Sequence, residues 1–267
     1  MSVSDRGSRF GILTLGAVIA VGTVVTAGCA ATLAKARKDP LSARIEAADV
    51  LWAARSGPGG FDRAMSAAVA LLAGAPTDPR VLFRLSRAQW VAGRIAPEDP
   101  LPHYEAGRAY GFRCLLANPA FAEAAHRAGD RVDTASAAAL TAVDAPCVAW
   151  TVANSLAVVS ARGPGASLRL EDAGHLLHAD AVRGTPGTDG MLDWDAAQLI
   201  LLDPSVFDRE AARSALRAAI AAAPTNGVFR AELSTTFPDA ADAAWEGWIE
   251  GEYRLEERGS TPPAVVP

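Results

Sequence analysis

The sequence predicts an all-α protein, an irregular array of helical hairpins (an α-solenoid) with about 10–12 helices. From about Leu41 onward, segments rich in Ala, Leu and Arg repeat apolar residues at helical spacing, and period-two alternation is nearly absent. Proline follows several of these segments, where it stops a helix. The chain has 267 residues, half of them hydrophobic, which is enough to bury a sizeable core.

The N-terminus has the layout of an export signal. Arg6 and Arg9 precede the uncharged apolar run 10–27, and small residues then lead into Cys29. This order resembles the lipobox of bacterial lipoproteins, with Thr26 where that motif usually carries Leu, Val or Ile. The resemblance implies cleavage before Cys29 and lipidation of its thiol. A cleaved signal without lipid and an uncleaved anchor helix are the alternatives.

These signals divide the chain into four segments. We expect a lipoprotein signal peptide over 1–28 and a linker over 29–44 that follows the lipidated cysteine. A helical domain is expected over 45–258. The tail 259–267 contains too little apolar surface to bury and is expected to be disordered.

The first clear hairpin has a spacing that resembles the tetratricopeptide repeat. Segment 61–72 places Ala64, Ala68 and Leu71 on one stripe, and Pro76 follows. That family has small, larger apolar, small and proline residues at these offsets, because small residues let two helices approach closely. Each hairpin leaves an apolar face that the next one covers. Three further sets share the spacing at uneven intervals, the first with a better fit: Ala212, Leu216, Ala219 and Pro224; Gly107, Gly111, Cys114 and Pro119; Gly174, His178, Ala181 and Pro186.

The middle of the chain contains a characteristic order of motifs. Tyr110 and Gly111 precede Asn118-Pro119, and a helix with Trp150 and Asn154 follows. This order resembles the TatT family, the periplasmic T component associated with TRAP transporters, over roughly residues 47–251.

The resemblance implies an all-helical lipoprotein, able to form a homotrimer, that serves an importer of organic acids or hydrophobic solutes. Its partner would be the periplasmic solute-binding protein of that importer. The implied location is the periplasmic side of the bacterial outer membrane, which Ala30 after Cys29 favours over the inner membrane.

Two cysteines remain in the mature chain, Cys114 and Cys147, separated by about the length of one helix-turn-helix repeat. An exported protein lies in an oxidising compartment, so a disulfide between stacked units is one interpretation. Two buried, unbridged cysteines that pack as small hydrophobic residues are the other. The sequence leaves both open.

Aromatic residues are the candidate ligand contacts. Trp90, Tyr110, Trp150 and Trp194 each lie inside or just before a predicted helix of a different pair. They could line the concave groove of the array and contact an apolar ligand or peptide, with Asn154 as a polar group that orients it. The alternative is that these rings fill the core.

Composition and motifs argue against most catalytic classes. The net charge of −5 opposes a nucleic-acid binder, and Lys35 and Lys38 are the only lysines, so no P-loop is present. The sequence contains no G-x-S-x-G, H-E-x-x-H, C-x-x-C or G-x-G-x-x-G motif, and we expect no enzyme activity, no cofactor and no metal. His175 and His178 could share a helix face, but Leu176 and Leu177 fill its buried side, which favours packed or solvated histidines.

Two functions fit these expectations. The first is a lipid-anchored accessory of a TRAP-type importer that binds a solute or a receptor. The second is a tetratricopeptide scaffold lipoprotein for assembly of outer-membrane or envelope machines. A dry cavity favours the first, and a polar concave groove sized for a peptide favours the second.

Overall fold

The computed structural model describes residues 39–96, 98–162, 167–179, 182, 185, 188, 190–203, 205–224 and 226–237. The chain divides into two compact units, Met1–Ala43 and Arg44–Pro267. In the first unit the described residues are 39–43, where the Asp39 carboxylate accepts a hydrogen bond of 3.2 Å from the Leu41 N–H. The predicted signal peptide, Cys29, residues 29–38 of the predicted linker and the tail 259–267 lie outside the described residues.

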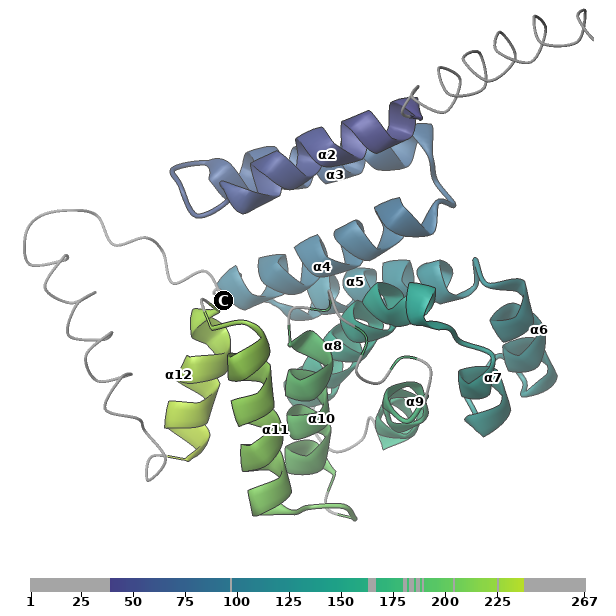
Figure 1. Ribbon diagram of the computed structural model, residues 1–267, viewed down its shortest axis with the longest axis vertical. Coiled ribbons are helices and arrows are strands. Elements are labelled where there is room, and N and C mark those ends of the chain that lie inside the picture. The colour runs from purple at the N-terminus through teal and green to yellow at the C-terminus, as the bar shows by residue number, and fades with distance from the viewer. Residues whose placement is uncertain are drawn as a thin grey trace, which may run out of the picture. The chain divides into compact units, whose positions relative to one another are not determined.

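Every described element is helical, which confirms the all-α prediction (Figure 1). Eleven α-helices and one 3-10 helix are present in the described ranges. The first helix begins inside the segment 29–44 that the sequence predicts to be a linker. The elements are α2 (Pro40–Ala53), α3 (Gly60–Gly74), α4 (Pro79–Ile95), α5 (Leu101–Leu115), α6 (Pro119–Arg127), α7 (Thr134–Ala138), η1 (Ala142–Asp144), α8 (Ala145–Arg162), α9 (Ser167–Leu177), α10 (Met191–Leu202), α11 (Arg209–Ala222) and α12 (Gly227–Thr236).

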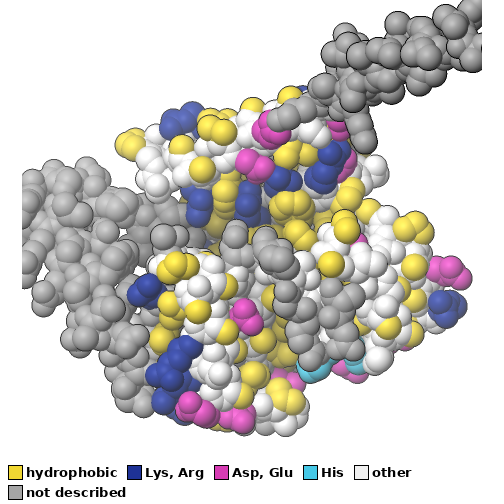
Figure 2. All heavy atoms as spheres, in the orientation of Figure 1, with side chains coloured by type: hydrophobic (Ala, Val, Ile, Leu, Met, Phe, Trp, Pro, Cys, Tyr) yellow, Lys and Arg dark blue, Asp and Glu magenta, His cyan; other side chains and the backbone are white. Residues whose placement is uncertain are grey.

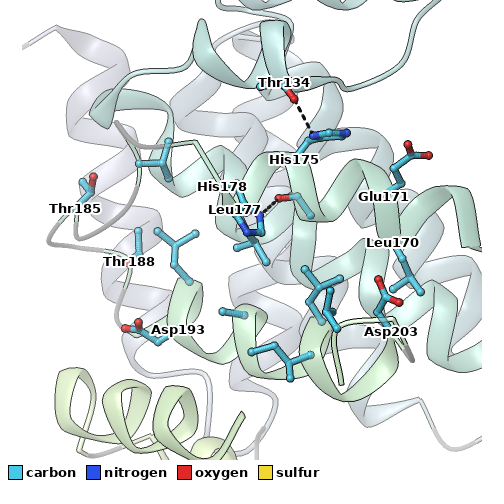
Figure 3. A pocket seen from close by; sticks show the side chains of 17 residues that line it. Thr134, Leu170, Glu171, His175, Leu177, His178, Thr185, Thr188, Asp193 and Asp203 are labelled. Carbon is cyan, nitrogen blue, oxygen red and sulfur yellow. Dashed lines mark hydrogen bonds between the residues drawn. The ribbon is translucent and has the colours of Figure 1, made fainter. Parts of the chain in front are cut away.

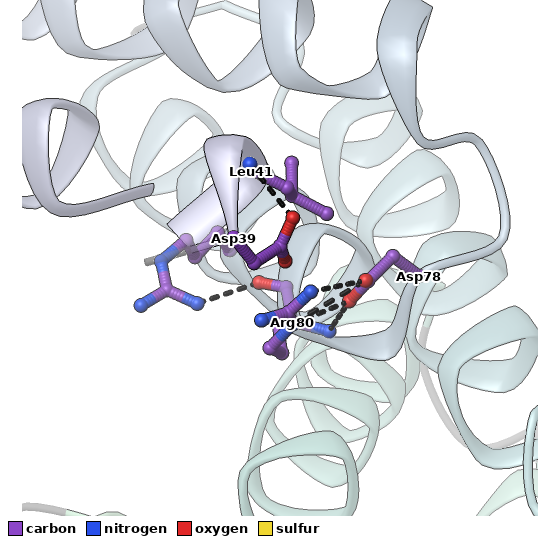
Figure 4. A network of polar contacts seen from close by, with 5 residues as sticks. Asp39, Leu41, Asp78 and Arg80 are labelled. Carbon is purple, nitrogen blue, oxygen red and sulfur yellow. Dashed lines mark hydrogen bonds and ion pairs between the residues drawn. The ribbon is translucent and has the colours of Figure 1, made fainter. Parts of the chain in front are cut away.

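Capping side chains set the beginnings of several helices. At the start of α4, the Asp78 carboxylate accepts from the Arg80 N–H at 2.8 Å and pairs with the Arg80 guanidinium at 2.8 Å (Figure 4). The hydrogen bond from the Arg80 side chain lowers the pKa of Asp78. The same capping role belongs to Asn118 for α6, Asp133 for α7, Asp208 for α11 and Asn226 for α12.

Helix α8 is the centre of the second unit. It packs against α4, α5, α9 and α10, and most of its residues are buried. The segment Ala142–Arg162 is the one described helix that is long and apolar enough to cross a membrane, and its burial in the core accounts for that composition. In a regular solenoid each unit contacts only its sequence neighbours, so this central helix makes the array irregular.

Two glycines of α5 bring it close to α8. A Cβ at Gly107 would clash with the Asn154 side chain, and a Cβ at Gly111 would lie 2.9 Å from the Thr151 Cα. A real side chain does not fit at such distances. The absence of a side chain at both positions therefore sets how closely the two helices pack.

The disulfide Cys114–Cys147 joins the same two helices. Its Cα atoms are 5.6 Å apart, and both residues are buried in the core. Of the two interpretations that the sequence left open, the structure contains the bridge. Cys114 is three residues after Gly111, so the covalent link and the close contact lie on one face of α5.

The core has two clusters of buried side chains. One surrounds the disulfide and includes Phe121, Val148 and Leu176. The other contains Trp90, Trp194 and further residues of α8, α11 and α12. The second cluster holds most of the predicted ligand residues.

Candidate functional site

Three of the five predicted ligand residues meet in one aromatic cluster. The Trp90 ring lies 5.8 Å from the Trp150 ring and 5.6 Å from the Trp194 ring, both edge to face. Phe229 of α12 stacks on Trp194 at 6.4 Å. These geometries are the favoured ones for aromatic pairs. Helices α4, α8 and α10 thus bring together rings that are far apart in the sequence.

The other two predicted residues have different surroundings. Tyr110 packs against the cluster around the disulfide, with the Arg113 guanidinium 5.6 Å from its ring centre. Asn154 is fully buried, and its amide donates to the Ser86 carbonyl at 3.0 Å and to the Trp150 carbonyl at 2.7 Å. Neither residue is among the described lining residues of the three cavities discussed below. In this position Asn154 ties α4 to α8 inside the core.

Trp90 lines a cavity of about 470 Å³, which we call the arginine–tryptophan pocket. It contains two guanidinium groups beside three indole rings. The sequence prediction included Trp90 and Trp150 but missed Arg55 and Arg87. A single arginine in a sequence is usually predicted to be a solvated surface residue. The described lining residues are Trp52, Arg55, Arg87, Trp90, Val91, Trp150, Thr188, Met191, Ala222, Ala223, Pro224, Asn226 and Gly227.

Asp49 of α2 pairs with Arg87, which lines this pocket, and with Arg84, which does not. Arg84 binds its carboxylate with two hydrogen bonds of 2.8 and 2.6 Å, and Arg87 lies 3.7 Å away. The hydrogen bond from Arg84 lowers the pKa of Asp49. Figure 2 shows basic side chains gathered between α2 and α4. The Trp52 ring makes cation–π contacts with two guanidinium groups. The Cζ atom of Arg87 lies 4.1 Å and that of Arg55 4.7 Å from the ring centre.

Trp90 also lines a smaller cavity of about 320 Å³. Tyr104, Trp194 and Gln198 contribute to its wall, and burial raises the pKa of Tyr104. Trp90 therefore belongs to the walls of two cavities.

A third cavity, of about 810 Å³, lies between α9 and α10; we call it the α9–α10 cavity (Figure 3). Apolar side chains provide most of its exposed surface, and polar residues also line it, among them the exposed Glu171, His178 and Asp193. Partial burial of the Asp193 carboxyl group raises its pKa. The apolar lining residues are Leu170, Leu177, Val182, Leu192, Ala196, Leu199, Ile200 and Val206.

The sequence prediction missed this cavity. Leu170 and Leu177 are seven residues apart on α9, as are Leu192 and Leu199 on α10, so two apolar stripes face one another. That spacing is the available signal, but it is the same for stripes that pack in direct contact. Only the separation of the two helices turns the stripes into the walls of a cavity.

His175 of α9 and His178, which follows the end of that helix, line the α9–α10 cavity. His175 Nδ1 lies 3.5 Å from the Thr134 hydroxyl, and His178 Nδ1 donates to the Gly174 carbonyl at 2.6 Å (Figure 3). Within the described ranges, no group of three His, Cys, Asp or Glu residues could hold a metal ion.

Asp195 is an unusual residue of α10. Its carboxyl group is fully buried, and neither oxygen has a hydrogen-bond partner among the described residues. Burial raises the pKa of Asp195 well above its usual value. Burial therefore favours the protonated, neutral form of this carboxyl group.

No family model, curated protein or solved structure matches the chain.

Proposed function

We propose that this protein is a lipid-anchored periplasmic accessory of a TRAP-type importer and that it holds an apolar solute. The observation that carries the proposal is the α9–α10 cavity, with about 810 Å³ and a wall whose exposed surface is mostly apolar. Small-molecule sites in proteins are mostly apolar cavities of roughly 300–1,000 Å³ with a few polar groups at defined positions. The size and mostly apolar surface of this cavity favour a solute carrier over a scaffold, which needs a polar groove sized for a peptide.

The rest of the proposal comes from the sequence. The order of basic residues, apolar run and Cys29 supports attachment to the outer membrane by lipid. The motif order around Trp150 supports a TatT-like role beside a periplasmic solute-binding protein, in a homotrimer with tetratricopeptide-like hairpins. We propose binding and transfer of a solute, with no catalysis and no cofactor.

The proposed solute site combines apolar contacts from two helices with polar residues at its edge. Leu177 and Leu199 provide apolar contacts from two different helices, while Asp193 and His178 stand exposed at the edge. An apolar molecule leaves water on entering such a space, which stabilises binding by about 25 cal/mol for each Å² of apolar surface buried. The polar residues at the edge of the cavity remain in contact with water, so the apolar part of a solute would lie deeper, between the two helices.

The alternative is a scaffold lipoprotein for assembly of envelope machines. The observation that favours it is exposed apolar surface on the first hairpin, where Val50 of α2 is 69% exposed and Val69 of α3 is 50% exposed. Apolar side chains on a helical array are common contacts for a partner helix.

Native mass spectrometry separates the two functions. The full chain with Cys29→Ser is purified from an expression host and its mass is recorded before and after gentle denaturation. A co-purifying small apolar molecule supports the importer accessory. A ligand-free protein that captures a peptide partner contradicts it and supports the scaffold. Genes for a TRAP permease beside the gene for this chain would support the first function, and pilus or barrel-assembly genes the second.

A further inference from the structure

The arginine–tryptophan pocket has features that the apolar solute site lacks. We propose that it is a second binding site, which takes a small organic anion with a flat apolar body, such as an aromatic carboxylate. The anion would bind Arg55 and Arg87, and the flat body would pack against Trp90 and Trp150. This proposal does not depend on the proposed function, because the two cavities have only Thr188 in common among their described lining residues and would take different ligands.

Arg55 is a cation without a carboxylate. One of its terminal nitrogens donates to the Trp52 carbonyl at 3.0 Å, while its Nε is buried and has no hydrogen-bond partner. No ion pair joins it to an acidic group in the described part of the chain. Partial burial lowers the pKa of Arg55, because the charged form loses hydration. A bound anion would restore the interactions that this guanidinium lost with water.

Two further groups add positive potential at the same place. Arg87 is one of two arginines that share Asp49, and at 3.7 Å it is the more distant of the two. Helix α12 begins at Gly227, in the wall of the pocket, and the N-terminus of a helix has a partial positive charge. Among the described lining residues there is no Asp or Glu. The pocket is therefore matched to an anion and opposes a cation.

The remaining wall determines the shape of the ligand. Three indole rings, those of Trp52, Trp90 and Trp150, line the pocket together with Met191. Indole faces favour planar apolar groups, and the edge-to-face contact of Trp90 with Trp150 fixes two of the rings relative to one another. The volume of about 470 Å³ is that of a small-molecule site, so a folded partner does not fit inside. Charge and shape together specify a small aromatic or flat apolar carboxylate.

Isothermal titration calorimetry with two matched probes tests the charge requirement. The full chain with Cys29→Ser is titrated with naphthalene-1-acetate and with naphthalene-1-acetamide, its uncharged counterpart of nearly the same shape. We expect the carboxylate to bind at least tenfold more tightly than the amide. We also expect Arg55→Gln to weaken carboxylate binding at least tenfold and to leave the amide unchanged. Equal affinities for the two probes, or no carboxylate binding at millimolar concentration, would overturn the proposal.

Three control variants locate the ligand. Arg217→Gln removes one charge from an exposed position of α11 that is not among the described lining residues of the three cavities above, and it should leave carboxylate affinity within twofold. Ala222→Trp places a ring at the exposed edge of the pocket and should block both probes. Gly174→Phe fills the other cavity and should change neither affinity.

Two results with these control variants would contradict binding in the arginine–tryptophan pocket. An equal effect of Arg217→Gln and Arg55→Gln would show a general charge effect, and loss of binding in Gly174→Phe would place the ligand in the α9–α10 cavity. Circular dichroism of every variant shows that the helices are intact, so a loss of affinity reports the pocket.

Discussion

The contact between α5 and α8 predicts that Gly111→Ala destabilises the protein, although alanine is the better helix former. Gly111 lies within α5, where alanine is favoured over glycine by about 1 kcal/mol in the absence of tertiary contacts. The new methyl group would lie 2.9 Å from the Thr151 Cα, a backbone atom that moves only with α8 itself. Overpacking of this kind costs about 1–3 kcal/mol.

The disulfide places this substitution toward the upper end of that range. Cys114–Cys147 holds α5 and α8 together three residues from Gly111, so the two helices have little freedom to separate. After the gain in helix propensity is subtracted, we expect a net loss of about 1–2 kcal/mol in the free energy of unfolding. For a domain of this size, each kcal/mol lowers Tm by about 2–4 °C.

Gly174→Ala is the matched control. This glycine also lies within a helix, but its added Cβ would meet only the Leu199 Cδ2 at 3.8 Å, an ordinary contact. The helix-propensity gain is then unopposed, and we expect a stabilisation of about 0.5–1 kcal/mol. Urea unfolding followed by circular dichroism measures both variants. If Gly111→Ala stabilises as much as Gly174→Ala, the close approach of α5 and α8 is wrong.

Three further predictions follow from buried or paired groups. Replacing Cys114 and Cys147 together by alanine opens a link that spans 33 residues and should cost about 3–4 kcal/mol in urea unfolding; a change below 1 kcal/mol would contradict the bridge. Asp195 has a folded pKa above its unfolded value of about 3.9, so wild-type stability falls as pH rises from about 4 toward the folded pKa. Asp195→Asn should therefore be the more stable protein at pH 7 and nearly equal at pH 4; a less stable variant at pH 7 would indicate an ionised, partnered carboxylate. Arg84 lowers the pKa of Asp49, so the contribution of Asp49 to stability is present above about pH 4 and is lost as pH falls through its folded pKa. Asp49→Asn should cost about 1 kcal/mol or less at pH 7, because the pair is partly exposed, and thermal unfolding should show a smaller cost at acidic pH; a cost that stays constant below pH 4 would contradict the pair.

The sequence was a good guide to local structure. Proline and the capping residues mark where α4 and α6 begin, since Asp78 and Asn118 accept hydrogen bonds from the first turn and proline occupies the first helical position. Small residues at helical spacing on α5 indicated a close helix contact, which the structure has at Gly107 and Gly111. These features depend on residues only a few positions apart.

The sites depend on tertiary geometry and were predicted only in part. Three different helices each direct one tryptophan into the same cluster: Trp90, Trp150 and Trp194. The orientation of α5 places Tyr110 against the other cluster. Separation in sequence could not decide whether two cysteines lie within bonding distance. Arg55 follows the end of α2 and gains its significance from α4 and α12, which no local pattern shows.

Binding of an uncharged apolar probe to the α9–α10 cavity tests the central claim most directly. Isothermal titration calorimetry of n-decanol with the full chain carrying Cys29→Ser should give saturable binding, which Gly174→Ala retains. Gly174→Phe places a ring between Leu177 and Leu199 and should abolish that binding while the helical signal in circular dichroism is unchanged. Decanol affinity that is the same in the wild type and in Gly174→Phe would contradict a solute site between α9 and α10.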